Sequence, residues 1–144
     1  MKKLIIFVVV AVLAYGTSQD WNFRVPGTEA PASSTEQTLQ QAYERKLSDI
    51  QVQGQGKVVR VLRDDLEGSR HQKFIVRVGS GLTLLISHNI DLAPRVAGLK
   101  SGDTIEFNGE YEWNPQGGVI HWTHHDPAGR HVPGWVKHNG QTYQ

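Results

Sequence analysis

Histidine side chains gather near the C-terminus of this chain of 144 residues. Five of its seven histidines fall in the final segment, where Asp126 stands beside the central pair; they are His121, His124, His125, His131 and His138. Neutral imidazole nitrogens and carboxylate oxygens are ligands of Zn²⁺ and of other divalent transition metals. The segment therefore predicts a site for one divalent metal such as Zn²⁺, formed by His121, His124, His125, Asp126 and His131.

The same histidines could instead have a structural role. An imidazole can cap a turn, pair with a carboxylate such as Asp126, or form hydrogen bonds across the surface of a barrel. In an extended strand His121 and His124 face opposite sides, so they converge only where the strand ends or bends near Thr123. Pro127 favours a strand end nearby, and both interpretations stay open at this point.

A bound metal with an open coordination position would also allow hydrolysis. The metal would lower the pKa of its bound water and supply a hydroxide, and Arg130 would stabilise an anionic transition state. A metal-dependent nuclease could use Asn139 as an orienting group, although too few residues follow His138 for the trailing helix of a ββα-metal nuclease. Arg130, Trp135, His138 and Asn139 are the candidate ligand-binding residues, and the sequence leaves open whether the protein is an enzyme.

Length and composition limit the class of protein. A chain of 144 residues fits one domain with flanking segments. Its 15 Lys and Arg nearly balance its 14 Asp and Glu, so overall charge does not favour sequence-blind binding of nucleic acid. The chain has no Cys, which excludes thiolate metal sites, disulfides and a lipid-modified cysteine.

The N-terminus has the pattern of an export signal. Lys2 and Lys3 precede the apolar run Leu4–Tyr15, and the small residue Gly16 would precede a cleavage site. The alternative is an uncleaved segment that anchors the chain in the inner membrane. In that case we expect this segment to be the only part of the chain that contacts the membrane. We therefore expect residues 1–16 to direct the protein to the periplasm or the medium, and residues 17–34, rich in Pro, Gly and Ser, to form a spacer.

One N-terminal helix and five strands are expected to position the histidine segment. Ser34 and Gln37 have the spacing of a capping box, followed by apolar residues on one helical face, which predicts a helix over residues 35–50. Period-two patterns predict strands at Lys57–Leu62, Phe74–Val78, Leu82–Ile86, Ile105–Trp113 and Ile120–Thr123. Between the third and fourth strands, Asp91–Leu99 predicts a short helix, with Pro94 near its start and Gly98 near its end.

This order of elements predicts a mainly β fold, a small five-stranded OB-fold-like barrel with a short helix between strands 3 and 4. Residues 99–111 (LKSGDTIEFNGEY) resemble the passage from the helix to the fourth strand of that fold. The resemblance covers residues 53–126 and leaves residues 127–144 as a His-rich tail packed on the barrel. Trp113 and Trp122 share the phase of the inward side chains and are expected in the core.

The C-terminal segment also resembles a family of small exported bacterial proteins of unknown function. The similarity rests on IHWTHHDP at residues 120–127, GRH at 129–131, GW at 134–135 and HNG at 138–140. The resemblance implies an OB-like barrel with this signature and supplies no catalytic residue.

A binding or accessory module of the cell envelope is the leading functional interpretation, and its ligand or protein partner is not identified by the sequence. The first predicted hairpin carries Lys57, Arg60, Arg63, Arg70, Lys73 and Arg77 in the part of an OB-fold that often contacts single strands. Nucleic acid is not favoured, because the only aromatic residue among these cations, Phe74, is in phase with the core. Divalent-metal-dependent hydrolysis is the alternative function.

Overall fold

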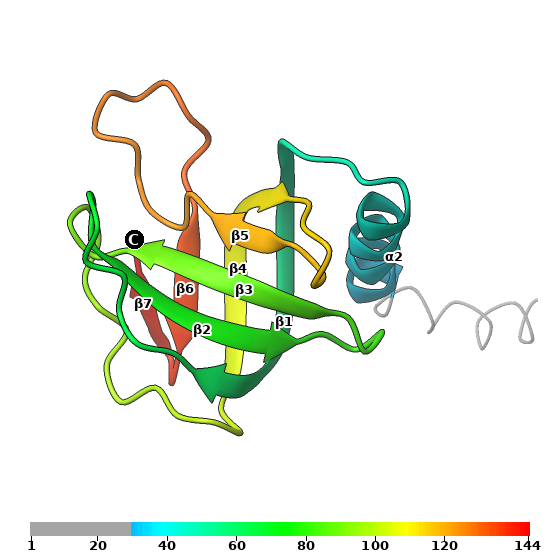
Figure 1. Cartoon of the computed structure of the whole chain (residues 1–144), viewed down its shortest axis with the longest axis horizontal. Helices are drawn as coiled ribbons and strands as arrows, with labels where there is room; N and C mark the ends of the chain where they lie inside the picture. The colour runs from blue at the N-terminus through cyan, green and yellow to red at the C-terminus, as the bar shows by residue number, and fades with distance from the viewer. Residues whose placement is uncertain (1–29) are drawn as a thin grey trace, which may run out of the picture. The chain divides into compact units, whose positions relative to one another are not determined.

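Five strands close into a barrel in the computed structural model, which describes residues 30–144. The strands are β1 (Ile50–Val61), β2 (His71–Arg77), β3 (Thr83–Asn89), β4 (Thr104–Glu112) and β5 (Val119–His121). They follow one another around the ring as β1, β2, β3, β5 and β4, and pairing of β4 with β1 closes it (Figure 1). Only the β3 to β5 pairing in this ring is parallel. The predicted five-stranded OB-fold-like barrel is therefore confirmed.

The barrel core is built from side chains that alternate along the strands. In β4, Ile105, Phe107 and Tyr111 are buried, while the glutamates between them lie toward the outside. Phe74 of β2 is fully buried in the same core, as its phase in the sequence predicts. Trp113, predicted in the core, follows the last residue of β4 and is half-buried against the core, on the side that the alternation along the strand indicates.

Helix α2 (Ala30–Glu44) precedes the barrel, and its Leu39 and Ala42 are buried in the core. The helix predicted over residues 35–50 is present, but it begins earlier, at Ala30, and ends earlier, at Glu44. The C-terminal end follows from Lys46, whose φ of 55° takes the chain out of the helical path. The Leu47 amide then donates to the Ala42 carbonyl (2.9 Å), which is the Schellman arrangement, here without the glycine that usually signals it.

The segment between β3 and β4 is a series of turns, so the short helix predicted over Asp91–Leu99 is wrong. The buried Gln72 side chain donates to the Val96 carbonyl (3.1 Å) and accepts from the Val96 amide (2.9 Å). These are the backbone groups that a helix would need for its own hydrogen bonds. The barrel therefore holds this segment through side chains, in a path that a helix could not follow.

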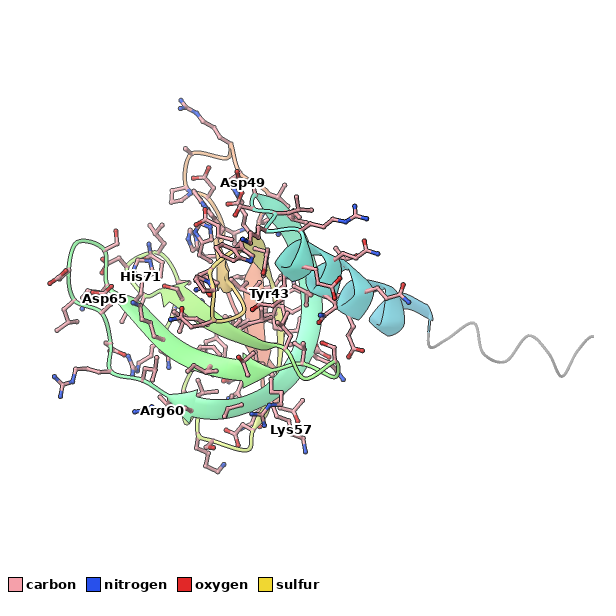
Figure 2. The ribbon with its side chains drawn as sticks, turned by 45° about the vertical axis from the view of Figure 1, so that its right-hand side comes forward. Tyr43, Asp49, Lys57, Arg60, Asp65 and His71 are labelled. Carbon is pink, nitrogen blue, oxygen red and sulfur yellow. The ribbon has the colours of Figure 1, made fainter. Side chains whose placement is uncertain are left out.

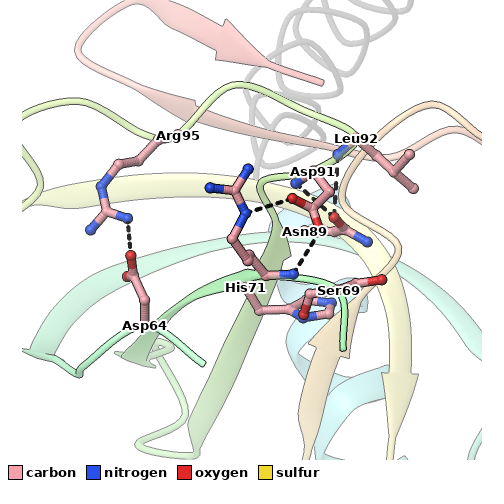
Figure 3. Close-up of polar contacts among 8 residues, drawn as sticks. Asp64, Ser69, His71, Asn89, Asp91, Leu92 and Arg95 are labelled. Atoms are coloured by element: carbon pink, nitrogen blue, oxygen red, sulfur yellow. Dashed lines mark hydrogen bonds and ion pairs between the residues drawn. The ribbon is translucent and has the colours of Figure 1, made fainter. Parts of the chain in front are cut away.

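Ion pairs also fasten this turn segment to the loop between β1 and β2. Arg70 Nε lies 2.7 Å from Asp91 Oδ1, and Arg95 pairs with Asp64 (Figure 3). These side chains are partly exposed, and exposed pairs of this kind contribute about 0–1 kcal/mol each. The pairs therefore define the path of the loop more than they stabilise the fold.

Two further strands lie outside the ring. Strand β6 (Trp135–His138) pairs with β4 at Glu106–Asn108, and β7 (Gln141–Tyr143) pairs with β6. Strand β5 pairs with β4 at Glu110–Glu112, so β5 and β6 lie one after the other along the same edge of β4 (Figure 1). Gly109 stands between the two pairings.

The predicted export signal and the start of the predicted spacer lie outside the described residues. Within residues 30–144, no helix has the length and apolar character needed to cross a membrane.

Replacing Gly109 by Ala should destabilise the barrel, because a Cβ there would overlap the His121 carbonyl oxygen and approach the Ile120 side chain to 2.8 Å. Overpacking of this kind costs about 1–3 kcal/mol in free energy of unfolding. Urea unfolding followed by tryptophan fluorescence measures the change. An unfolding midpoint equal to that of the wild type would contradict the close approach of β5 to β4.

Candidate functional site

Residues 122–134, which we call the histidine loop, leave the barrel after β5 and return to it at β6 (Figure 1). Strand β5 ends at His121, and Trp122 has a φ of 56°, which turns the chain away from the sheet. At the other end the Gly134 amide donates to the His124 carbonyl (3.0 Å). The loop is closed at its base, as in the compact Ω-type loops that often carry function.

Asp126 organises the interior of this loop. Its Oδ1 accepts from the Ala128 amide (3.0 Å), and its Oδ2 accepts from the amides of Arg130 (2.9 Å) and His131 (3.0 Å). The bonds from Ala128 and Arg130 are the main reason why the pKa of the Asp126 carboxyl is lowered. Both carboxylate oxygens are therefore engaged in holding the backbone of the loop.

His124 and His125 occupy different environments. His124 is buried, and its Nδ1 lies 2.7 Å from the His125 carbonyl oxygen, so the imidazole donates to the backbone there. The side chain of His125 is exposed. These neighbouring histidines of the sequence do not form a common site with Asp126, whose oxygens are bonded to backbone amides.

His131 is held in one orientation by three contacts. Its ring stacks on Trp122, with 4.0 Å between ring centroids and 8° between planes. Its Nδ1 lies 2.8 Å from the Val132 carbonyl oxygen, and its Nε2 lies 3.2 Å from Glu110 Oε2. Trp122 is thus half-buried against His131, and its predicted place in the core is wrong because the chain leaves the strand at this residue.

His121 approaches the same carboxylate from β5. Its Nε2 lies 3.5 Å from Glu110 Oε2 and 3.2 Å from Glu112 Oε1. This nitrogen atom is buried and has no hydrogen-bond partner of acceptable geometry. We call His121, His131, Glu110 and Glu112 the His–Glu cluster.

The two glutamates of this cluster were missed by the sequence analysis. Glu110 is the direct cross-strand partner of His121, and Glu112 lies two residues further along β4, on the same outer face. The alternation of Glu110 and Glu112 with apolar residues can be seen in the sequence. Finding them would have required the register of the hairpin around residues 113–118, which places His121 opposite Glu110.

Of the five predicted metal ligands, the structure brings His121 and His131 together and keeps His124, His125 and Asp126 in the separate roles given above. As the side chains stand, no group of three or more His, Asp or Glu residues within 30–144 is arranged to hold a metal ion. Metal binding therefore stays a prediction at this point.

The four predicted ligand-binding residues lie at separate places. Arg130 is exposed in the histidine loop, and Trp135 begins β6, where Lys137 Nζ lies 4.2 Å from its ring centroid. Asn139 is exposed in the turn after β6, with a φ of 49°. His138 is buried, and its Nε2 lies 2.8 Å from Asp103 Oδ2.

A second buried histidine, His88, fastens the base of the histidine loop. Its Nε2 donates to the Pro94 carbonyl oxygen (2.9 Å), which leaves Nδ1 to accept from the Thr123 hydroxyl (2.7 Å). Burial lowers the pKa of the His88 imidazole. These hydrogen bonds join β3, the turn segment and Thr123. They could not be predicted from the sequence, in which His88 is one polar residue among others in a strand.

One protein family matches a range of the chain that includes the whole candidate site. A protein-family model described as "Protein of unknown function (DUF3465)" matches residues 23–144, a range that includes the barrel, the histidine loop and the His–Glu cluster. No curated protein matches the chain.

Replacing Asp103 by Asn should change the acid stability of the fold. The hydrogen bond from His138, and after it those from Lys100, lower the pKa of the Asp103 carboxyl from 3.8 to about 2. A folded-state pKa below the unfolded value stabilises the fold above the unfolded pKa of 3.8, and this stabilisation is lost as the pH falls toward about 2. We expect a lower melting temperature at neutral pH and a shallower decline between about pH 4 and pH 2.

Thermal unfolding followed by circular dichroism over that pH range measures the effect. Glu67→Gln is the control, since Glu67 is an exposed carboxyl of the loop between β1 and β2. If D103N follows the pH dependence of the wild type, the pair does not link the β6–β7 hairpin to the barrel.

Proposed function

The chain belongs to this family of proteins of unknown function (DUF3465), and we propose that it is an exported binding module whose ligand lies on the outer face of β2 and β3. The observation that supports the proposal is an open pocket of about 210 Å³ on this face. Its lining residues are Leu62, Ile75, Thr83, Leu84, Leu85, Asn114, Gln116 and Gly118. In small OB-type barrels this face and the adjoining loops are where extended ligands bind.

The floor of the pocket is apolar. Ile75 of β2 and Leu85 of β3 are direct cross-strand partners, and both are half-buried on the outer face of the sheet. Leucine and isoleucine side chains that are left partly exposed beside one another favour an apolar group of a ligand. The pocket lies between the end of β1 and the loop that joins β4 to β5, which supply Leu62 and Asn114.

Cations border this apolar floor. Arg60 is the cross-strand partner of Ile75, Arg77 is the partner of Thr83, and Lys57 is the partner of Arg77. None of these three cations forms an ion pair with another residue of the range 30–144. Figure 2 shows Lys57 and Arg60 on the outside of the barrel. A ligand that carries both apolar groups and negative charge is therefore the chemical class that this face fits.

Nucleic acid fits this face less well. The outward side chains of β2 and β3 are His71, Lys73, Ile75, Arg77, Thr83, Leu85, Ser87 and Asn89. None of them is Phe, Tyr or Trp, although stacking of bases on aromatic side chains is the usual source of affinity for single strands. We therefore propose an apolar anion as the ligand. Neither the family match nor the geometry of the described residues supports the metal-dependent nuclease alternative.

Anilinonaphthalene sulfonate is a suitable probe because it combines apolar rings with one negative charge. We expect the native chain to bind the dye with enhanced fluorescence, and salt to weaken the binding. The double variant R60A/R77A should bind it about tenfold more weakly, a loss of about 1.4 kcal/mol in binding free energy. Leu85→Asp, which places a carboxylate at the pocket floor, should abolish binding.

Arg130→Ala is the matched control, since it removes one exposed cation from the histidine loop, which contributes no residue to the pocket. Melting temperatures of all variants check that the fold is retained. Dye binding that R60A/R77A and L85D leave unchanged would contradict a ligand site on this face.

Export is tested separately, by expressing the full chain in a Gram-negative bacterium and fractionating the cells. Lys2, Lys3 and the apolar run after them support recognition as an export signal. We expect a periplasmic product whose N-terminus is Thr17, or a full-length product in the inner membrane if the segment stays as an anchor. A chain that lacks residues 1–16 is the control and should stay in the cytoplasm; a full-length product in the cytoplasm would contradict export.

A further inference from the structure

The His–Glu cluster on β4, β5 and the histidine loop shares no residue with the pocket of the proposed function. We propose that this cluster binds one divalent cation of the Zn²⁺ class, through Nε2 of His121, Nε2 of His131 and the carboxylates of Glu110 and Glu112. The site differs from the ligand set that the sequence suggests, because both carboxylates come from a barrel strand and Asp126 is not a ligand.

The first argument is the hydrogen bonding of His131. Its Nδ1 faces the Val132 carbonyl oxygen at 2.8 Å, and a carbonyl can only accept, so the proton of a neutral ring lies on Nδ1. Nε2 then presents a lone pair toward Glu110 Oε2, 3.2 Å away, which is also an acceptor. Two acceptors at this distance repel each other unless a proton or a metal cation lies between them.

The second argument is the environment of His121. Its Nε2 is buried without a hydrogen-bond partner, yet it lies 3.2 Å from Glu112 Oε1 and 3.5 Å from Glu110 Oε2. An unpaired buried polar atom is costly, so such an atom in a folded protein calls for a partner. A cation held between this nitrogen and the two carboxylates would be that partner.

Three of the six separations among the four proposed ligand atoms agree with a shared cation. In a tetrahedral Zn²⁺ site with bonds of about 2.0–2.1 Å, neighbouring ligand atoms are about 3.3 Å apart. The three separations between imidazole and carboxylate atoms in the cluster are 3.2, 3.2 and 3.5 Å. Histidine nitrogen and carboxylate oxygen are also a ligand set that suits Zn²⁺ better than Mg²⁺ or Ca²⁺.

The cluster must adjust to complete the site, since its side chains do not yet surround one point. The adjustment falls on the carboxylates. The Glu112 side chain is 48% exposed, which leaves space around it, whereas the His131 ring is fixed by Trp122 and by the Val132 carbonyl. A backbone carbonyl that accepts from the other ring nitrogen is the usual outer support of a metal-binding histidine.

The test is zinc binding by the untagged full chain, which is freed of metal with a chelator and titrated with ZnCl₂ in a calorimeter at about pH 7.5. We expect about one Zn²⁺ per chain and a rise in melting temperature with zinc. His121→Ala and His131→Ala should each weaken the binding by about 10- to 100-fold, and Glu112→Gln by a smaller factor. The matched control is His125→Ala, which removes an exposed histidine of the same loop and should leave the affinity unchanged.

Circular dichroism of each variant checks the fold, and E112Q keeps the test decisive if a histidine variant fails to fold, because this side chain is exposed. Three results would overturn the proposal. They are a folded chain that takes up no zinc, zinc binding that is unaffected by H121A, H131A and E112Q, and zinc binding that H125A removes.

Discussion

Hydrogen bonding along one edge of β4 is the constraint on which the functional surface depends. Strand β5 occupies this edge at Glu110–Glu112, and β6 occupies it at Glu106–Asn108. Both ends of the histidine loop are therefore fastened to the same strand, and Gly109 leaves room for the chain where the two pairings meet. The register also sets His121 opposite Glu110, so the contacts of the His–Glu cluster follow from the backbone pairing.

Buried polar side chains fasten the irregular segments that surround the barrel. Gln72 holds Val96, His88 joins Pro94 to Thr123, and His138 joins β6 to Asp103. Each of these groups must find a hydrogen-bond partner once it is removed from water, so each one specifies a single path for the segment it contacts. The chain has no Cys, so these contacts hold the irregular segments without any disulfide.

The barrel presents two surfaces of opposite chemistry. The outer face of β2 and β3 combines apolar side chains with Arg77 and with Lys57 and Arg60 of the adjoining strand β1. The His–Glu cluster, at the edge of β4, combines two carboxylates with two imidazoles whose Nε2 atoms face them. An apolar anion suits the first surface and a divalent cation suits the second, so the proposed ligand site and the proposed metal site lie on separate parts of one small fold.

Sequence by itself determined the barrel. Alternation of apolar and polar residues in Phe74–Val78 and Ile105–Trp113 marks strands buried on one side, because burial repeats with the same period as side-chain direction. The clustering of His121, His124 and His131 likewise indicated a candidate site at the end of β5 and in the histidine loop. Local patterns of this kind need only neighbouring residues.

Tertiary structure alone decided which side chains meet. Glu110 and Glu112 join His121 and His131 through strand pairing, Asp126 turns inward to its own backbone, and the helix expected over Asp91–Leu99 gives way to turns held by Gln72. The partners of Asp126 lie within five residues of it, whereas in the other two cases the partner is remote in the chain or depends on hairpin register. Residue types and spacing do not encode such contacts, because their hydrogen bonds form only after the strands have closed into the barrel.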